Sequence, residues 1–291
     1  MDKSSEDKSF FQVIVHSFFI IPFLIAVFCI LLFAGVRLLT EENRTAYDYL
    51  EDVKTGGVTK RWQGAFELSK ILANTKLVPD DERFRNELIQ AFDKAKHDDP
   101  RVRQYLALAM GRTGDDKFVE PLLNDLDQES SNNLPALIYS LGMLQNKKSA
   151  NSLYPYLEHS DARIRSLTVA ALGTIGNRDS IPQLTKMLND PEANVQWGAA
   201  ISLARLGDNN GRNIIKKLLD RQYYQSFAEV DSQEVNHLML AAMESSEKIQ
   251  DPEFENLLQN LAASDQNMKI RKTAMEILKV KYSNGSKAAN N

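Results

Sequence analysis

Small and apolar residues recur through the middle of the chain with a period of about 31 residues. Successive shifts of that length lead from Gly111 to Gly142, Gly173 and Ala204, and from Gly114 to Gln145, Gly176 and Gly207. A fixed period of roughly 20 to 50 residues is typical of repeat architectures. The register holds through four copies, so the pattern predicts an array of similar units.

Each copy begins with positions spaced i, i+4, i+7, i+8 and i+11, which lie on one face of a helix. Most of them are apolar or small: Val102, Leu106, Ala109, Met110, Thr113; Asn133, Leu137, Ser140, Leu141, Leu144; Ile164, Thr168, Ala171, Leu172, Ile175; Val195, Ala199, Ser202, Leu203, Leu206. The glycines that follow suit a left-handed helix C-terminus. A second apolar set comes next: Val119, Leu122, Leu126; Ala150, Leu153, Leu157; Ile181, Leu184, Leu188; Ile215, Leu219. Each copy is therefore predicted to be a helical hairpin.

A hairpin with one apolar stripe cannot bury that stripe alone, so the copies are expected to stack. Less regular segments flank them: Thr59–Asn74, Asp81–Lys96, Val235–Glu244, Phe254–Leu261 and a final helix near Met268–Val280. The predicted fold is all-α, a solenoid of about six hairpins plus a terminal helix over residues 59–281. The polar tail at residues 282–291 is predicted to be disordered.

Two phrases show what begins a first helix: DPRVRQYLALAMGRTG from Asp99 and DARIRSLTVAALGTIG from Asp161. Asp99 suits the N-cap, and Pro100 suits the first helical position, where no donor is needed. Arg103 and Arg165 each stand four residues after an aspartate, and that spacing predicts weakly stabilising pairs within the helix.

These phrases have the form D-x-x-[VI]-R followed by A-L-G-x-x-G, which resembles the HEAT-like repeats of the phycobilisome-lyase type. The resemblance covers about residues 60–280 and is strongest over residues 99–220. Asn133-Leu134 and Val195-Gln196 depart from it where the Val-Arg pair should stand. The resemblance implies an α-solenoid. It does not imply lyase activity, because the repeat consensus is structural.

Phe18–Val36 is apolar throughout and, at about 1.5 Å per residue, is nearly as long as a bilayer core is thick. The alternative is a cleaved signal, but Leu32 or Phe33 would occupy the small position that cleavage requires. We therefore predict a tail at residues 1–13, a membrane anchor at residues 14–38 and a linker at residues 39–58. Basic residues nearly tie across the span, and the short tail slightly favours an extracytoplasmic solenoid.

The chain has 291 residues, 43% hydrophobic and 25% charged, with a net charge of −4, as is ordinary for a protein with a packed core. Nucleic-acid-binding proteins usually carry a basic excess, so we expect no nucleic-acid partner. Cys29 is the single cysteine and lies in the apolar stretch, which excludes disulfides and thiolate metal sites from the predicted solenoid.

Candidate chemistry is sparse. His97 and His159 occupy the same turn two repeats apart, about 20 Å at the usual helix spacing, too far to share a metal. We interpret both, and His237, as solvated residues. Gly142–Ser149 approaches a phosphate-binding loop but lacks its second glycine and a preceding strand. We expect no enzyme activity, no metal, no cofactor and no small-molecule substrate.

Some residues break the column pattern and are candidates for binding a partner. Trp197 lies off the buried stripe, and an insertion at residues 220–233 interrupts the period with Tyr223, Tyr224 and Phe227. These rings either form an interface or pack against the irregular join. Arg101 and Arg163 recur at one position, either facing acidic partners or forming an intramolecularly paired ladder.

The sequence favours a membrane-anchored, non-enzymatic scaffold in the cell membrane that binds a membrane-associated protein partner. The alternative, by family analogy alone, is a chromophore-lyase-like enzyme. DNA binding by such an array conflicts with the charge balance and the apolar stretch.

Overall fold

The structure, a computed structural model, describes residues 16–40, 44–127 and 132–282, and all regular structure in those ranges is helical. The chain divides into two compact units, Met1–Thr45 and Ala46–Asn291. The predicted tail at residues 1–13, and residues 283–291 of the polar tail, lie outside the described ranges.

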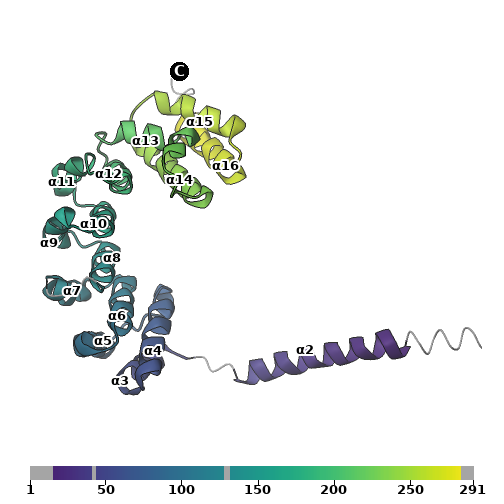
Figure 1. Ribbon diagram of the computed structural model, residues 1–291. Coiled ribbons are helices and arrows are strands. Elements are labelled where there is room, and N and C mark those ends of the chain that lie inside the picture. Colours follow the sequence, from purple (N-terminus) through teal and green to yellow (C-terminus); the bar gives the residue numbers. More distant parts are fainter. Residues whose placement is uncertain (1–15, 41–43, 128–131, 283–291) are drawn as a thin grey trace, which may run out of the picture. The chain divides into compact units, whose positions relative to one another are not determined.

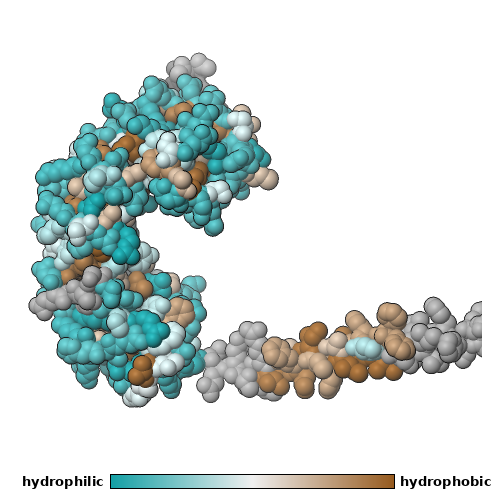
Figure 2. Space-filling model, viewed as in Figure 1, coloured by the Kyte–Doolittle hydropathy of each residue, from teal (hydrophilic) through white to brown (hydrophobic). Residues whose placement is uncertain are grey.

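The first unit contains one long helix. A π-helical turn at His16–Ile20 leads into α2, Ile21–Thr40. The stretch Phe18–Val36 is long and apolar enough to cross a membrane, and none of it is buried. Its apolar surface contrasts with the mainly hydrophilic surface of the second unit (Figure 2). A signal sequence near the N-terminus would also meet these criteria of length and composition.

The second unit, the array, is a succession of helical hairpins. Its α-helices are α3 Ala46–Thr55, α4 Val58–Ile71, α5 Glu82–Lys94, α6 Pro100–Thr113, α7 Val119–Leu126, α8 Leu134–Leu144, α9 Ser149–Leu153, α10 Ala162–Ile175, α11 Ile181–Met187, α12 Ala193–Arg205, α13 Arg212–Leu218, α14 Ser232–Lys248, α15 Glu253–Ser264 and α16 Met268–Ile277. Short 3₁₀ turns at Thr75–Leu77, Ala95–His97, Asp116–Phe118, Tyr154–Glu158, Arg178–Ser180 and Arg221–Ser226 join them, and a π turn at Leu278–Tyr282 follows α16.

The first helices of successive hairpins pack side by side, α4 on α6, α6 on α8, α8 on α10 and α10 on α12. The second helices α5, α7, α9 and α11 form the other layer, on the outer side of the curve (Figure 1). The described array thus holds the predicted hairpins from α4/α5 to α14/α15 and the terminal α16. The prediction of an all-α solenoid is confirmed.

The array begins earlier than the sequence suggested. Helix α3 lies within the predicted linker and packs against α4 and α5. Leu50 and Val53 of α3 are fully buried, although the helix has too few apolar residues for a clear stripe. The chain between α2 and the array is correspondingly shorter than predicted.

The predicted stripe forms the core: every one of its twenty positions in the first helices is buried except Thr113, which is intermediate. The core has two parts, which share α12. Val195, Ala199 and Leu203 of α12, with Leu206 at its C-cap, belong to the N-terminal part, which runs from Ala46 to Leu206. Trp197, Ala200, Ile201 and Ala204 belong to the C-terminal part, which runs to Ile277.

Backbone conformation explains the second glycine series of the repeat, which starts at Gly114. Within the described residues a positive φ occurs at four positions, which are the predicted ones: Gly114 (69°), Gln145 (53°), Gly176 (73°) and Gly207 (74°). Gly114, Gln145 and Gly176 directly follow the last residue of a first helix, and Gly207 stands two residues after the end of α12. Glycine adopts this left-handed conformation without strain, whereas a side chain such as that of Gln145 costs about 1–2 kcal/mol there.

Packing between helices explains the first glycine column, the series that starts at Gly111. The repeat pattern alone does not show this reason. A Cβ atom on Gly111 would lie 2.7 Å from the Ser140 Cα atom, and one on Gly142 would lie 3.0 Å from the Ala171 Cα atom. Both distances are shorter than ordinary van der Waals contact. These glycines therefore let successive first helices approach backbone to backbone.

Candidate functional site

Trp197 is buried, with 3% of its surface exposed, beneath the insertion that follows α13. Its indole Nε1 donates a hydrogen bond of 3.1 Å to the Tyr223 hydroxyl. Edge-to-face contacts join its ring to Phe227 at 4.9 Å, Tyr224 at 6.0 Å and Tyr223 at 6.2 Å between centroids. The 3₁₀ turn Arg221–Ser226 thus folds the insertion back onto α12.

The insertion residues differ in exposure. Tyr224 is buried and donates to the Leu218 carbonyl at 2.9 Å, and its burial raises the pKa of its phenol. Tyr223 and Phe227 are half-buried. Trp197 and Tyr224 therefore pack within the chain, as the packing alternative expects. Tyr223 and Phe227 are partly exposed to solvent. A partner contact through this cluster stays a prediction.

Arg101 and Arg163 both pair with an aspartate of their own helix cap. The Arg101 Nη2 atom lies 2.6 Å from Asp99 Oδ2, and the Arg163 Nη2 atom lies 2.7 Å from Asp161 Oδ2. The hydrogen bonds from the Arg101 side chain and backbone lower the pKa of Asp99 to about 2. Both side chains remain half or more exposed, at 50% and 85%. They form the predicted paired ladder and still face solvent.

The prediction that Arg103 and Arg165 pair with the cap aspartates was wrong. Arg103 is 1% exposed; it donates to Asp125 Oδ2 at 2.8 Å and lies over the Phe92 ring. Arg165 binds both oxygens of Asp190 at 2.8 Å. Each cap aspartate pairs instead with the arginine two residues after it, Arg101 or Arg163. The arginine four residues after it points inward between helices.

These buried pairs join neighbouring elements. Burial alone would raise the pKa of Asp125, but hydrogen bonds from Lys96 and Arg103 outweigh it and hold the pKa below the ordinary value. Hydrogen bonds from Arg165 likewise lower the pKa of Asp190. Breaking a buried ion pair costs about 3–5 kcal/mol, so these groups hold the array together.

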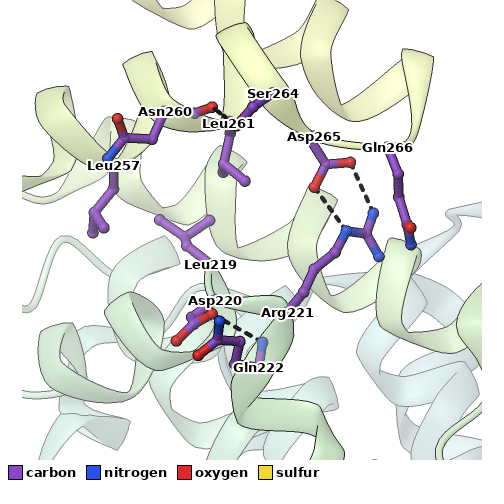
Figure 3. Close-up of a pocket in the computed structure, with 10 residues that line it drawn as sticks. All are labelled: Leu219, Asp220, Arg221, Gln222, Leu257, Asn260, Leu261, Ser264, Asp265 and Gln266. Carbon is purple, nitrogen blue, oxygen red and sulfur yellow. Dashed lines mark hydrogen bonds and ion pairs between the residues drawn. The ribbon is translucent and has the colours of Figure 1, made fainter.

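A pocket of about 470 Å³ opens between the insertion and the α15–α16 turn (Figure 3). Leu219, Leu257 and Leu261 gather on one side, and Arg221 faces Asp265 on the other. Arg221 binds both oxygens of Asp265, at 2.7 and 2.9 Å, and Asp265 is almost fully buried. Arg221 and Asp265 therefore satisfy each other, and Asp220 accepts a hydrogen bond from the Gln222 amide at 2.9 Å.

A second hollow, the Tyr139 groove, lies on the solvent side of the first helices and has a volume of about 320 Å³. Its lining comes from α6, the residues just before α8, α8 itself and α10: Gln104, Tyr105, Leu108, Asn132, Pro135, Ala136, Tyr139 and Leu167. Tyr139 is 46% exposed. The repeat pattern does not predict this groove, because its members differ in residue type between equivalent positions of the repeats.

The remaining sequence candidates stay apart from one another. His97 and His237 are exposed, and His159 accepts a hydrogen bond from the Asp161 amide at 3.0 Å. No cluster of metal-binding side chains occurs within the ranges that the structure describes. The loop-like segment Gly142–Ser149 covers the end of α8, the turn that follows it and the first residue of α9, with no strand before it.

Comparison with known proteins finds HEAT repeats in part of the array. Residues 150–228 match the family model described as HEAT repeats. The chain is 27% identical over 158 residues to the bilin biosynthesis protein PecE of Nostoc sp., covering 54% of this chain and 58% of that protein. It is 27% identical over 175 residues to PecE of Mastigocladus laminosus, covering 60% of each. The match therefore spans less than two thirds of these relatives.

The fold is also similar to a chain in the complex of CpcE and CpcF of phycocyanin lyase from Nostoc sp.. The TM-score is 0.54 at 20% identity, over 82% of this chain and 97% of the other. The chain thus contains a segment that matches HEAT repeats, is similar in sequence to the PecE proteins and shares the fold of a chain from the CpcE–CpcF complex, in line with its repeat phrases. These similarities lend no support to a membrane anchor.

Proposed function

We propose that this chain is a HEAT-repeat subunit that binds a second protein, in an assembly akin to those of the bilin-lyase subunits it resembles. The carrying observation is its relation to PecE together with its structural likeness to a chain from the complex of CpcE and CpcF. In that complex a chain of similar fold occurs with a protein partner.

The local chemistry supports binding as the chain's own role. Where strong ion pairs occur, as at Arg103–Asp125, Arg165–Asp190 and Arg221–Asp265, they connect helices. Ion pairs of this kind stabilise an array without offering a free acid or base for proton transfer. The exposed face of the first helices supplies the apolar and tyrosyl groups that protein interfaces favour.

The test is purification of the intact protein from its own source in a mild detergent. We expect one partner at a fixed stoichiometry by mass spectrometry and light scattering. A monomer across detergents and salt concentrations would refute the proposal. Paired Tyr223→Ala and Phe227→Ala substitutions then test the insertion, with exposed His237→Ala as the control: loss of the partner places the contact there, and retention places it elsewhere on the array.

A lyase-type activity is the second candidate, and the names of both curated relatives favour it. Incubation with a bilin and an apoprotein acceptor, followed by denaturing electrophoresis and pigment fluorescence, tests it. A covalent adduct that depends on this chain would make it an enzyme or part of one. Equal adduct levels with and without the chain would leave binding as its role.

We also propose that α2 anchors the protein in the cell membrane with the array on the extracytoplasmic side. The apolar stretch has 19 residues, none of them buried. At about 1.5 Å per residue it nearly matches the roughly 30 Å hydrocarbon core. If α2 is an anchor, the protein should stay with the membrane at alkaline pH and have the mass of the full chain. If α2 is a cleaved signal, the protein should have a lower mass. Reporter fusions at the C-terminus test the orientation.

A further inference from the structure

The turn between α12 and α13 contains an asparagine followed directly by a glycine, Asn210 and Gly211. The chain has one other such pair, at residues 284–285, which lies outside the described ranges. The Asn210 side chain is exposed, and it makes no hydrogen bond within the part of the chain that the structure describes. Its carboxamide carbon is therefore accessible to a nucleophile.

The same turn occurs in each regular repeat, and the fourth copy lacks one of its hydrogen bonds. In the three earlier copies the equivalent amide donates to the carbonyl three residues before it: Phe118 to Asp115 at 3.1 Å, Ser149 to Asn146 at 3.0 Å and Ser180 to Asn177 at 3.1 Å. Among residues 16–40, 44–127 and 132–282 the Gly211 amide has no hydrogen-bond partner. The backbone nitrogen beside the Asn210 side chain is therefore not held by an acceptor.

Packing against α12 requires a glycine at position 211. A Cβ atom there would lie 2.6 Å from the Ala200 Cα atom and 2.9 Å from the Ala200 Cβ atom, so a side chain would force α13 away from α12. A side chain on the residue after an asparagine also hinders the approach of its nitrogen to the carboxamide, and glycine has none. The fold therefore retains the unhindered pair.

We infer that Asn210 deamidates spontaneously and that this modification loosens the contact between α12 and α13. The Gly211 nitrogen gives its proton to a base in the solvent and bonds to Cγ of Asn210. The carboxamide C–N bond breaks, and its nitrogen takes up a proton and leaves as ammonia. The product is a cyclic succinimide. Water adds to either of its carbonyl groups and opens the ring, which leaves an aspartate or an isoaspartate at position 210.

The two products change the turn differently. Aspartate keeps the backbone and adds a negative charge, whereas isoaspartate carries the main chain through the former side chain and adds a methylene to the backbone. That methylene enters directly before Gly211, whose Cα atom is held against Ala200. It therefore displaces the start of α13, the helix that buries Ile215 and Leu218 in the C-terminal part of the core.

The test ages the full-length protein in a mild detergent, in warm and mildly alkaline water enriched in heavy oxygen. Digestion with trypsin in ordinary water then releases the peptide LGDNNGR, so that only residues modified during ageing carry the heavy label. Tandem mass spectrometry should show Asn210 modified severalfold faster than Asn209. Both side chains are exposed, but the amide after Asn209 donates to Asp208 Oδ1 at 2.8 Å. Equal labelling, or none, would overturn the inference.

A matched variant separates the fold from the dipeptide. Lys148→Asn combined with Ser149→Gly places the same pair at the equivalent turn of an earlier repeat, where the amide donates to the Asn146 carbonyl. Lys148 is exposed, and the buried Ser149 hydroxyl has no hydrogen-bond partner in the described residues, so the change is mild. Melting curves confirm that the variant is folded. Asn210 should be modified severalfold faster than the engineered pair, and equal rates would overturn the role of the free amide.

Hydrogen exchange tests the structural consequence. Asn210→Gln keeps the carboxamide but requires closure of a larger ring, so this variant should resist modification. Aged wild-type protein that contains isoaspartate, detected with an isoaspartyl methyltransferase, should exchange the α13 amides faster than aged Asn210→Gln, while the fresh proteins should match. Equal exchange in the two aged samples would overturn the loosening of the α12–α13 contact.

Discussion

The substitution Gly111→Ala tests whether the first glycine column sets the distance between successive first helices. The added Cβ atom would lie 2.7 Å from both Cα and Cβ of Ser140. The Cα atom belongs to the backbone of α8, so the clash cannot be relieved by a side-chain rotation. Gly198→Ala is the matched control, because its Cβ atom would meet only Val169 Cγ1, at an ordinary 3.4 Å.

Both substitutions gain about 1 kcal/mol of helix propensity. Overpacking a tight contact costs about 1–3 kcal/mol, and only Gly111→Ala incurs that cost. Gly198→Ala should therefore stabilise the array by up to about 1 kcal/mol, and Gly111→Ala should fall about 1–3 kcal/mol below it. Because the propensity gain is common to both variants, their difference isolates the contact.

The assay is urea unfolding of the full-length protein in a mild detergent, followed by circular dichroism at the helix band. Long arrays do not always unfold in one step, so the midpoints of the transition are compared first. Adding Ser140→Gly to Gly111→Ala removes the Cβ contact and should recover part of the loss. Equal midpoints for Gly111→Ala and Gly198→Ala would refute the close-approach reasoning.

Three further predictions concern single positions. Gln145→Gly should raise the free energy of unfolding by about 1 kcal/mol by relieving a left-handed side chain, and a lower urea midpoint would contradict this. Arg103→Ala should cost about 3–5 kcal/mol, whereas exposed Arg163→Ala should change stability by less than about 0.5 kcal/mol; similar losses would mean that Arg103 is not a buried partner. Arg165 lowers the pKa of Asp190, so the stability from that pair is complete above about pH 4 and is lost as the pH falls through the lowered pKa. Asp190→Asn should flatten the acid limb of a melting-temperature profile, and an unchanged limb would show that another carboxylate governs it.

The repeat period made much of this fold predictable. The stripe from Val102 to Leu206 and the turn column at Gly114 follow from elementary helix periodicity and backbone conformation. The partly helical character of Tyr47 to Val53 is visible in the sequence, but the packing of α3 into the array is not, because its buried Leu50 and Val53 stand among polar residues that resemble a linker. A short helix of this kind gains its stability from packing, which a local pattern does not show.

The site was less predictable because its contacts join residues distant in sequence. A local rule paired Arg103 with Asp99, whereas the folded chain offers Asp125 on the next helix. Trp197 was correctly seen to lie off the stripe, but only the path of the insertion shows that Tyr223 and Phe227 cover it. The Tyr139 groove brings together equivalent positions of three repeats that carry different residue types, such as Tyr105, Ala136 and Leu167, so no recurring residue type predicts it.

Helix α12 gives alternate faces to the two parts of the core, and this has a mechanical consequence. Each part can fluctuate as a cooperative block, but neither can open fully without exposing one side of the shared helix. A distortion of one block is therefore transmitted to the other through a rotation of α12. A ligand seated on the earlier repeats would alter amide exchange in the later ones through α12.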